Sequence, residues 1–328
     1  MDIIAPRYRL EECHDDTEWD NFVDASLQGN IFCRSGFLKG LGVEYRRYFV
    51  AEGAARMLAF MVMLQNGCAL SAPMPFTMYQ GIMSSPNLAE EPWHRRSLSE
   101  QKLLEFVFEE MANKYGRISF CLHPTWTDIR PFTWYNYGME ASRRFNVDVR
   151  YTGWLALTPE LTVAELARTM RTLRQREIRR AIRSGCKTEI SQDIDMLCLL
   201  HELTFARQGI LLDDNDKHLV RSINIAALRE KLGEIRVGIV GGKVVSAYLI
   251  LYDNVSGYYL FGANDPEYRD SGASSLLMAD CIHRCASRGL QRFDFVGINS
   301  PRRGDFKQSF GAHPVSYYVA NWSASSKE

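Results

Sequence analysis

Three stretches in the second half of the chain combine residue types that could bind an anion or act on a carbonyl group. In Arg269 to Ser274, Gly272 and Ala273 stand at the predicted start of a helix. Backbone N–H groups at a helix start bind anions, and glycine lets a ligand approach closely, although the same residues could simply shape a helix cap. The other two stretches hold Asp294, in FDFVG, and Lys307, in FKQSFG. Asp294 could be a general base, but an aspartate inside an apolar strand is more often hydrogen-bonded to backbone or to an arginine.

Arginines are concentrated in the segment 162–184, which contains seven of them. With 3.6 residues per turn, Arg168, Arg176, Arg179 and Arg183 gather on one side of a helix, which is typical of a solvated face. Arg174 falls beside the apolar stripe instead. A partly desolvated guanidinium there would bind a phosphate or carboxylate more strongly than one in water.

Aromatic side chains are concentrated in the stretch 124–138, PTWTDIRPFTWYNYG. Trp134 and Tyr137 could form a wall of an acceptor pocket, because amphipathic rings hold a ligand and keep a polar handle. The alternative is that these rings fill space between two domains.

The elements that position these residues form a βαβ unit. A strand at 258–262 ends in turn residues, a helix runs from Gly272 to Gly289, and a second strand follows at 293–297. The two strands should be parallel. A loop is predicted at 297–305, and a hairpin joins strands 235–240 and 244–252.

The remaining pattern predicts a mixed α/β protein. Further strands are expected at 45–51, 56–64, 117–122, 151–157, 186–190 and 315–322. Helices are expected from about residue 15, at 35–41, at 97–115 with a capping box of Ser97 and Glu100, along 162–184 with a capping box of Thr162 and Glu165, at 193–207, and at 218–231.

Composition limits the classes of partner. The 328 residues are 46% hydrophobic, and 39 basic residues balance 39 acidic ones. Neutral charge predicts no general affinity for DNA or membranes, and no apolar run approaches the roughly 18 residues of a membrane helix. The start has no signal-peptide pattern, so we expect a cytoplasmic protein without membrane insertion. The eight cysteines show no metal-ligand spacing, and Cys281 and Cys285 are interpreted as buried free thiols.

The runs YYLFGANDPEYRDSGAS, RGLQRFDFVG and FKQSFG resemble the second domain of the FemAB-type transferases, which carry two copies of the GCN5-related N-acyltransferase (GNAT) fold. RQREIRRAIRSG, at 174–185, is similar to a basic helix of that family, and the first half is similar through GNIFCRSGFL and DIRPFTWYNYG. The resemblance implies two tandem GNAT-like domains, at 1–150 and 151–314, with a last strand at 315–328 that returns to the first.

The same resemblance assigns roles to residues. The opened backbone of Leu260, Phe261, Gly262 and Ala263 would receive the acyl arm of the donor. Arg269, Gly272 and Ala273 would hold the pyrophosphate of acyl-CoA, although Ser274 departs from the usual glycine or alanine of that loop. Lys307 would stabilise charge in the reaction channel. The acceptor would contact Arg174, Arg179, Trp134, Tyr137 and Phe306.

The sequence therefore predicts an enzyme that transfers an acyl or aminoacyl group to the amine of a cell-wall precursor, an amino sugar or a peptide-like metabolite. The donor would be acyl-CoA or aminoacyl-tRNA, acting as co-substrate, and no permanent cofactor or metal is expected. One alternative is a non-catalytic binding module that retains the fold. A second, an RNA-binding protein without transferase activity, is disfavoured by the neutral charge and by the lack of an RNA-stacking motif.

Overall fold

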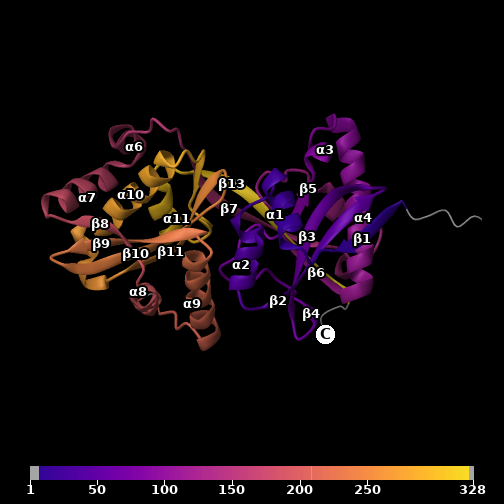
Figure 1. Cartoon of the computed structure of the whole chain (residues 1–328), viewed down its shortest axis with the longest axis horizontal. Helices are drawn as coiled ribbons and strands as arrows, with labels where there is room; N and C mark the ends of the chain where they lie inside the picture. The colour runs from indigo at the N-terminus through magenta and orange to yellow at the C-terminus, as the bar shows by residue number, and fades with distance from the viewer. Residues whose placement is uncertain (1–6, 208, 325–328) are drawn as a thin grey trace, which may run out of the picture. The chain divides into compact units, whose positions relative to one another are not determined.

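The computed structural model describes residues 7–207 and 209–324. The chain divides into two compact units (Figure 1). Unit 1 comprises the chain up to Leu38, Val43–Arg150 and the residues from Ser316 onward, and unit 2 comprises Lys39–Gly42 and Tyr151–Val315. Each unit has its own hydrophobic core.

Unit 1 contains an antiparallel sheet in the order β1-β2-β3-β4, with β5 also paired to β3. Its strands are β1 (Tyr8–Glu12), β2 (Glu44–Glu52), β3 (Ala55–Gln65), β4 (Cys68–Ala69) and β5 (Ile82–Ser84). A further strand, β6 (Arg117–Cys121), pairs antiparallel with the end of β13 (His313–Ser323). The predicted strands 45–51, 56–64 and 117–122 are confirmed, whereas β1 was not predicted.

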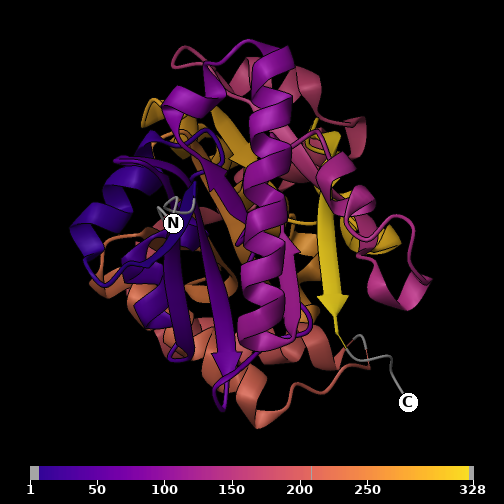
Figure 2. The ribbon, with the colours of Figure 1, turned by 90° about the vertical axis from the view of Figure 1, so that its right-hand side faces the viewer.

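The longest helix of unit 1, α4 (Trp93–Tyr115), lies along its sheet (Figure 2). It buries the predicted apolar residues Leu103, Leu104, Val107, Phe108 and Met111. The predicted start at Ser97 is wrong, because Pro92 is the N-cap and the helix begins at Trp93. Ser97 and Glu100 therefore lie inside the helix, and they form no capping box.

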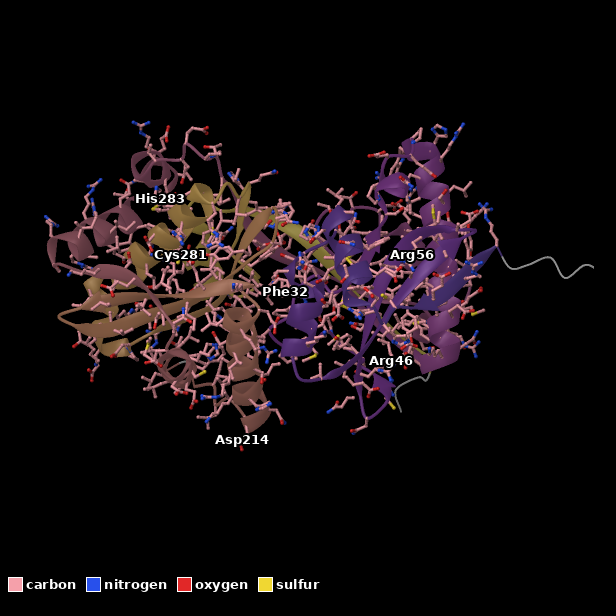
Figure 3. All side chains as sticks on the ribbon, viewed as in Figure 1. Phe32, Arg46, Arg56, Asp214, Cys281 and His283 are labelled. Carbon is pink, nitrogen blue, oxygen red and sulfur yellow. The ribbon has the colours of Figure 1, made fainter. Side chains whose placement is uncertain are left out.

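The other helices of the first half are short. They are α1 (Asp16–Ala25), α2 (Ser35–Gly40), α3 (Pro86–Ala89) and α5 (Arg130–Trp134), with 3-10 turns at Ile31–Cys33 and Ala141–Arg143. The predicted helices at residues 15 and 35 are confirmed. Side chains of this unit are drawn in Figure 3, where Arg56 projects from β3; its guanidinium lies 4.1 Å from the ring centre of Phe49.

The sheet of unit 2 has the order β7-β12-β11-β10-β9-β8. Its strands are β7 (Asn146–Ala156), β8 (Lys187–Ser191), β9 (Gly233–Val240), β10 (Lys243–Tyr252), β11 (Ser256–Asn264) and β12 (Arg292–Asp294). Strands β11 and β12 are parallel, as the βαβ pattern predicted, and β9 and β10 form the predicted hairpin.

Helices cover the sheet of unit 2, with α7 and α10 on one face and α8 on the other (Figure 1). They are α6 (Val163–Thr169), α7 (Thr172–Arg183), α8 (Ile194–Ala206), α9 (Asp214–Arg229), α10 (Ala273–Ser287) and α11 (Pro301–Gln308), with a 3-10 turn, η3, at Pro266–Ser271. The capping box of Thr162 and Glu165 is confirmed.

Two predictions for these helices are wrong. The segment 162–184 forms two helices, because Met170 and Arg171 have extended backbone, with ψ near 147° and 146°. The predicted loop 297–305 gives way to α11, which begins at Pro301, a residue favoured in the first helical turn. As a result Lys307 projects from a helix.

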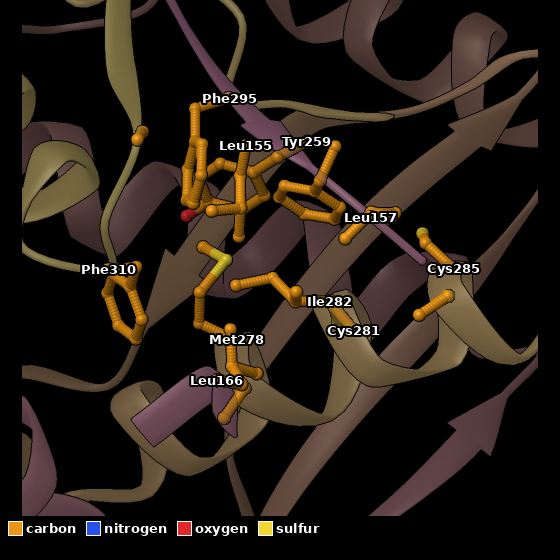
Figure 4. Close-up of a cluster of buried hydrophobic side chains, with 14 of the residues drawn as sticks. Leu155, Leu157, Leu166, Tyr259, Met278, Cys281, Ile282, Cys285, Phe295 and Phe310 are labelled. Carbon is orange, nitrogen blue, oxygen red and sulfur yellow. The ribbon is translucent and has the colours of Figure 1, made fainter. Parts of the chain in front are cut away.

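The core of unit 2 lies between its sheet and α10, where Met278, Ile282 and Leu277 are fully buried (Figure 4). The predicted apolar stripe of this helix is confirmed. Cys281 and Cys285 are buried free thiols, as predicted, and burial raises the pKa of both. Such thiols stay protonated, so they contribute packing rather than nucleophiles.

Candidate active site

Strands β11 and β12 separate after a short parallel pairing. They are in register over three pairs, from Ser256 with Arg292 to Tyr258 with Asp294. Strand β12 then ends, while β11 continues to Asn264. We call Tyr259–Asn264 the diverging segment. It contains the four residues expected to receive the acyl arm of a donor.

A β-bulge at Leu260 shapes the diverging segment. Tyr259 pairs with Ile250 of β10 and Phe261 pairs with Leu249, so Leu260 is the extra residue. The bulge reverses the alternation of side chains. Phe261 consequently points to α8, where its ring centre lies 5.2 Å from that of His201.

Glycine at position 262 leaves room for the Tyr259 side chain. A Cβ atom at Gly262 would lie 1.6 Å from the hydroxyl oxygen of Tyr259, so the two residues face the same side of the sheet. The Tyr259 side chain thus lies flat along the diverging segment, inside the core of unit 2 (Figure 4). Ala263 is fully buried, and Leu260 is half-buried.

Helix α8 fixes the far end of the diverging segment. The backbone N–H of Asn264 donates to the Thr204 hydroxyl at 2.9 Å, and this hydroxyl lies 3.2 Å from the Asn264 carbonyl. Both backbone groups of Asn264 therefore face the edge away from β10. Since strand residues alternate with a period of two, the backbone groups of Gly262 face the same edge.

Lys307 lies where the two strands separate. Its ammonium group donates to the carbonyl oxygens of Val296 and Gly297, at 2.5 and 2.9 Å. The same nitrogen lies 5.4 Å from the ring centre of Tyr259. Helix α11 thus places a cation between the diverging segment of β11 and the turn that follows β12.

The turn that holds Lys307 has an uncommon backbone. Val296 and Gly297 have φ angles of 50° and 57°, and a positive φ is a genuine outlier for a β-branched residue such as valine. Because both residues are left-handed, their successive carbonyl oxygens converge on the Lys307 nitrogen. We call this feature the carbonyl clamp.

Burial lowers the pKa of Lys307 to about 7. This value already includes an increase from the Asp294 carboxylate and a smaller decrease from Arg303. An ammonium group that has lost its water is less stable than the neutral amine. Both protonation states of Lys307 are therefore accessible near neutral pH.

Asp294 holds the carbonyl clamp in place. Its carboxylate is 1% exposed and accepts hydrogen bonds from the Thr152 hydroxyl, the Trp154 indole N–H and the Val296 N–H, at 2.5, 2.8 and 2.8 Å. The sequence left two alternatives for Asp294, a general base or a hydrogen-bonded residue. The structure shows it hydrogen-bonded, with a hydroxyl, an indole N–H and a backbone N–H among its partners. Its position suits a residue that orients Lys307.

Arg174 and Phe306 are brought together beside this site. The Arg174 guanidinium lies 5.0 Å from the Phe306 ring centre and 6.0 Å from that of Phe310. It also donates to Glu177 and to the Ser275 hydroxyl, at 2.5 and 3.1 Å. Arg174 is thus mostly buried, as its place beside the apolar stripe predicted.

Of the other expected acceptor residues, one belongs to unit 2 and two belong to unit 1. Arg179 is exposed on α7 and donates to Gln175 on its own helix. Trp134 and Tyr137 belong to unit 1, and their side chains are 45% and 70% exposed. The Arg130 guanidinium lies 5.3 Å from the Trp134 ring. Within unit 2, only Arg174 and Phe306 of this set contact each other in the described structure.

The start of α10, the expected phosphate site, is packed against α7. Gly272 has φ of 79°, and a Cβ atom there would lie 2.3 Å from the Glu177 carbonyl oxygen. The Ala273 N–H donates to the Ser271 hydroxyl at 3.2 Å, and the Ser275 hydroxyl donates to the Glu177 carboxylate at 2.5 Å. Arg269 is exposed. A carboxylate therefore already complements the positive end of this helix.

Several residues of the site were not identified from the sequence. For Glu177 the sequence shows only that it stands three residues after Arg174, and this spacing is common in helices. Val296 precedes a glycine, but nothing in FDFVG indicates a left-handed valine. Thr204 and Tyr259 stand far apart in sequence and meet the site only through the fold.

Residues 166–308 match the family model described as an acetyltransferase (GNAT) domain. Among solved structures, the chain is similar to FemX, with a TM-score of 0.63, 13% identity, and coverage of 94% of this chain and 96% of the other. It is also similar to a tandem GNAT protein from the clavulanic acid biosynthesis pathway, with a TM-score of 0.56, 9% identity, and coverage of 98% and 100%. For L-PGS from Bacillus licheniformis the TM-score is 0.56 and the identity 10%, with coverage of 95% and 93%. A search of curated protein sequences found no match.

These structural similarities confirm the predicted α/β architecture of two tandem GNAT-like folds. None of the helices in residues 7–207 and 209–324 combines the length and apolar character that crossing a bilayer requires.

Proposed function

We propose that this chain is a FemAB-like member of the GNAT acyltransferases and that it transfers an acyl or aminoacyl group from a thioester or ester donor to an amine. The acceptor would be the amine of a cell-wall precursor, an amino sugar or a peptide-like metabolite. The proposal rests on one observation above all, the position of the Lys307 ammonium at the point where β11 and β12 separate.

The donor carbonyl would lie along the diverging segment, where the backbone of Gly262 offers hydrogen bonds at the strand edge. The neutral acceptor amine attacks the carbonyl carbon and forms a C–N bond, and negative charge develops on the carbonyl oxygen. A fixed cation or N–H donor at that oxygen lowers the barrier by a few kcal/mol. The intermediate then expels the thiolate or alkoxide of the donor, and the proton of the amine leaves with it.

The environment of Lys307 suits this role. The carbonyl clamp accepts hydrogen bonds from two of the N–H groups of Lys307. These two bonds fix the direction in which the third N–H group points. Asp294 holds the clamp through the Val296 N–H. A cation oriented before the reaction needs no reorganisation when charge appears on the substrate.

The α10 contacts favour an ester donor over acyl-CoA. Glu177 places a carboxylate at the helix start where the pyrophosphate of CoA would bind, and the Ala273 N–H is already hydrogen-bonded. This carboxylate is paired with Arg174 and Ser275, so a pyrophosphate at the same place would have to displace it from both partners. An aminoacyl-tRNA ester needs no diphosphate at this position, and the exposed arginines of α7 could contact its phosphates.

The acceptor would enter on the side of Arg174 and Phe306. A guanidinium that stacks on an aromatic ring is held flat, and with Nη1 bonded to Glu177 and Ser275 it would offer Nη2 to a carboxylate or phosphate. Arg179, Trp134 and Tyr137 remain candidates for contacts with more distant parts of the acceptor.

A direct test supplies the purified protein with a panel of radiolabelled acyl-CoA thioesters and, separately, with charged tRNAs, and measures amide formation with amine acceptors. We expect product from charged tRNA, and loss of at least about 100-fold of the rate in Lys307→Ala. Product from acyl-CoA alone would overturn the preference for an ester donor but keep acyl transfer. Ligand binding without product from any donor would favour the non-catalytic binding module.

A further inference from the structure

A pocket within unit 1 is lined by none of the residues that form the candidate site of unit 2. Its empty space, which includes space open to solvent, is about 370 Å³, and its walls come from the start of α4, the end of β5 and the loop after β6. Trp93, Arg96 and Glu100 project into it from one face of α4, and Ser84 and Asp128 face them. The spacing of three and four residues places the α4 side chains one above another.

Glu100 carries the argument, because its side chain is mostly buried and its carboxylate has an ion pair but no hydrogen bond in the described part of the chain. The residue is 8% exposed and lines the pocket. Its nearest cation is Arg96, whose Nε lies 3.5 Å away and makes no hydrogen bond. Within residues 7–207 and 209–324, no donor forms a hydrogen bond to this carboxylate. A buried charge in this condition is costly unless a ligand satisfies it.

Ser84 supplies a second polar group that lines the pocket. It is 1% exposed and lines the pocket, and its hydroxyl has no hydrogen-bond partner within the described part of the chain. Its backbone N–H donates to the Gln28 side chain at 3.0 Å, which fixes the residue in place. Native proteins satisfy most buried polar groups, so this unpaired hydroxyl marks a place where a ligand could bind.

The charges around the pocket select the chemistry of that ligand. Asp128 is neutralised by Arg130 through two hydrogen bonds of 2.9 and 2.6 Å. Glu91 adds a third carboxylate near Glu100, so three carboxylates face two guanidiniums, those of Arg96 and Arg130. The surplus is negative. A positively charged donor of hydrogen bonds complements it, whereas a carboxylate or phosphate ligand does not.

We propose that this pocket binds a primary amine, with the Glu100 carboxylate and the Ser84 hydroxyl accepting its N–H groups. A primary ammonium has three donors, enough for both acceptors and a water molecule. The half-exposed Trp93 ring at the pocket wall would cover the aliphatic part of the ligand. The site is independent of the acyl-transfer site in unit 2.

The proposal has a defined pH dependence. Burial raises the pKa of Glu100 to about 7, with smaller increases from Asp128 and Glu91 and an opposing effect from Arg96. Alkylammonium ions keep their charge up to about pH 10. The carboxylate is therefore half ionised at about pH 7, the ion pair approaches full formation between about pH 8 and 10, and at lower pH binding must displace a proton from Glu100.

Ligand-observed saturation-transfer NMR tests the site with propylamine as the probe and propan-1-ol, which has the same size, as the neutral control. We expect propylamine to bind at pH 8, to bind about tenfold more weakly at pH 6, and to lose measurable binding in Glu100→Gln. Propan-1-ol should show no such dependence. Ser84→Ala should weaken propylamine binding severalfold.

Glu105→Gln is the matched control, because Glu105 lies on the same helix and is exposed. This variant should bind propylamine like the original protein, and so should Lys307→Ala, whatever the outcome for acyl transfer. Thermal unfolding checks that Glu100→Gln is folded, which we expect because glutamine keeps the size and removes a buried charge. Equal propylamine affinity in Glu100→Gln and the original protein, or no binding to either, would overturn the proposal.

Discussion

The ammonium nitrogen of Lys307 lies 5.4 Å from the ring centre of Tyr259, so a cation from α11 faces the strand that continues beyond the end of β12. Tyr259 is also the residue whose hydroxyl lies against Gly262, at the bulge of β11. One aromatic side chain therefore links the shape of the diverging segment to the position of the charge. A ligand along β11 would contact the edge of this arrangement.

Lys307→Ala should reduce the rate of amide formation by about 100-fold while the protein stays folded. The physical reason is the loss of a fixed cation beside the developing oxyanion. Lys187→Ala is the control, because Lys187 is an exposed lysine of the same unit. Single-turnover rates and circular dichroism would measure both effects. Equal rates for the two variants would remove Lys307 from the reaction.

The pH dependence of the rate should distinguish a charge-stabilising lysine from a basic one. Because burial lowers the pKa of Lys307 to about 7, its ammonium form is lost as pH rises through 7. If the ammonium is the active form, kcat/KM falls above pH 7, and Lys307→Arg moves this fall to higher pH because guanidinium stays charged. A rate that instead increases above pH 7 would mean that the neutral amine acts as a base.

The sequence predicted the parts of the fold that depend on local pattern. The apolar stripe of α10, the glycine hairpin before β10 and the capping box at Thr162 were all found, because periodicity and turn residues act over short distances. The break between α6 and α7 was missed. Neither Met170 nor Arg171 is a helix breaker, and the break depends on packing, where the Arg171 N–H donates to the Ser309 carbonyl.

In the candidate site, too, local motifs were predictable and features that depend on packing were not. Lys307 and the diverging segment could be named from motifs, but the carbonyl clamp could not, since a left-handed Val296 is set by the Asp294 hydrogen bond and not by its own preference. The α10 start is similar. Gly272 signalled a close approach, and the sequence could not indicate that the approaching group is Glu177 rather than a ligand.

Asp294→Asn should destabilise the protein by about 1–3 kcal/mol and also change the pH profile of the reaction. The amide can still accept from some donors, but its NH₂ group would face one of the three donors that surround the carboxylate. Since Asp294 raises the pKa of Lys307, its removal should shift the fall in kcat/KM to lower pH.

Thr152→Val is the control for Asp294→Asn. It removes one hydrogen bond to the carboxylate and keeps the charge, so it should lower stability with little movement of the pH profile. Chemical denaturation and a pH series of kcat/KM would separate the two effects. Identical pH profiles for Asp294→Asn and the original protein would show that Asp294 is structural only.

Gly272→Ala should destabilise unit 2 more than Gly242→Ala, which has the same backbone strain but no steric clash. Gly272 and Gly242 have nearly equal φ angles, 79° and 81°, so alanine costs about 1 kcal/mol of backbone strain at each. At Gly242 the new methyl group meets open space, whereas at Gly272 it would lie 2.3 Å from the Glu177 carbonyl oxygen and must push α7 away from α10. We expect an additional loss of about 1–3 kcal/mol, as for other overpacked sites. Chemical denaturation of the two variants measures the difference, and equal losses would mean that α7 does not pack on the start of α10 in solution.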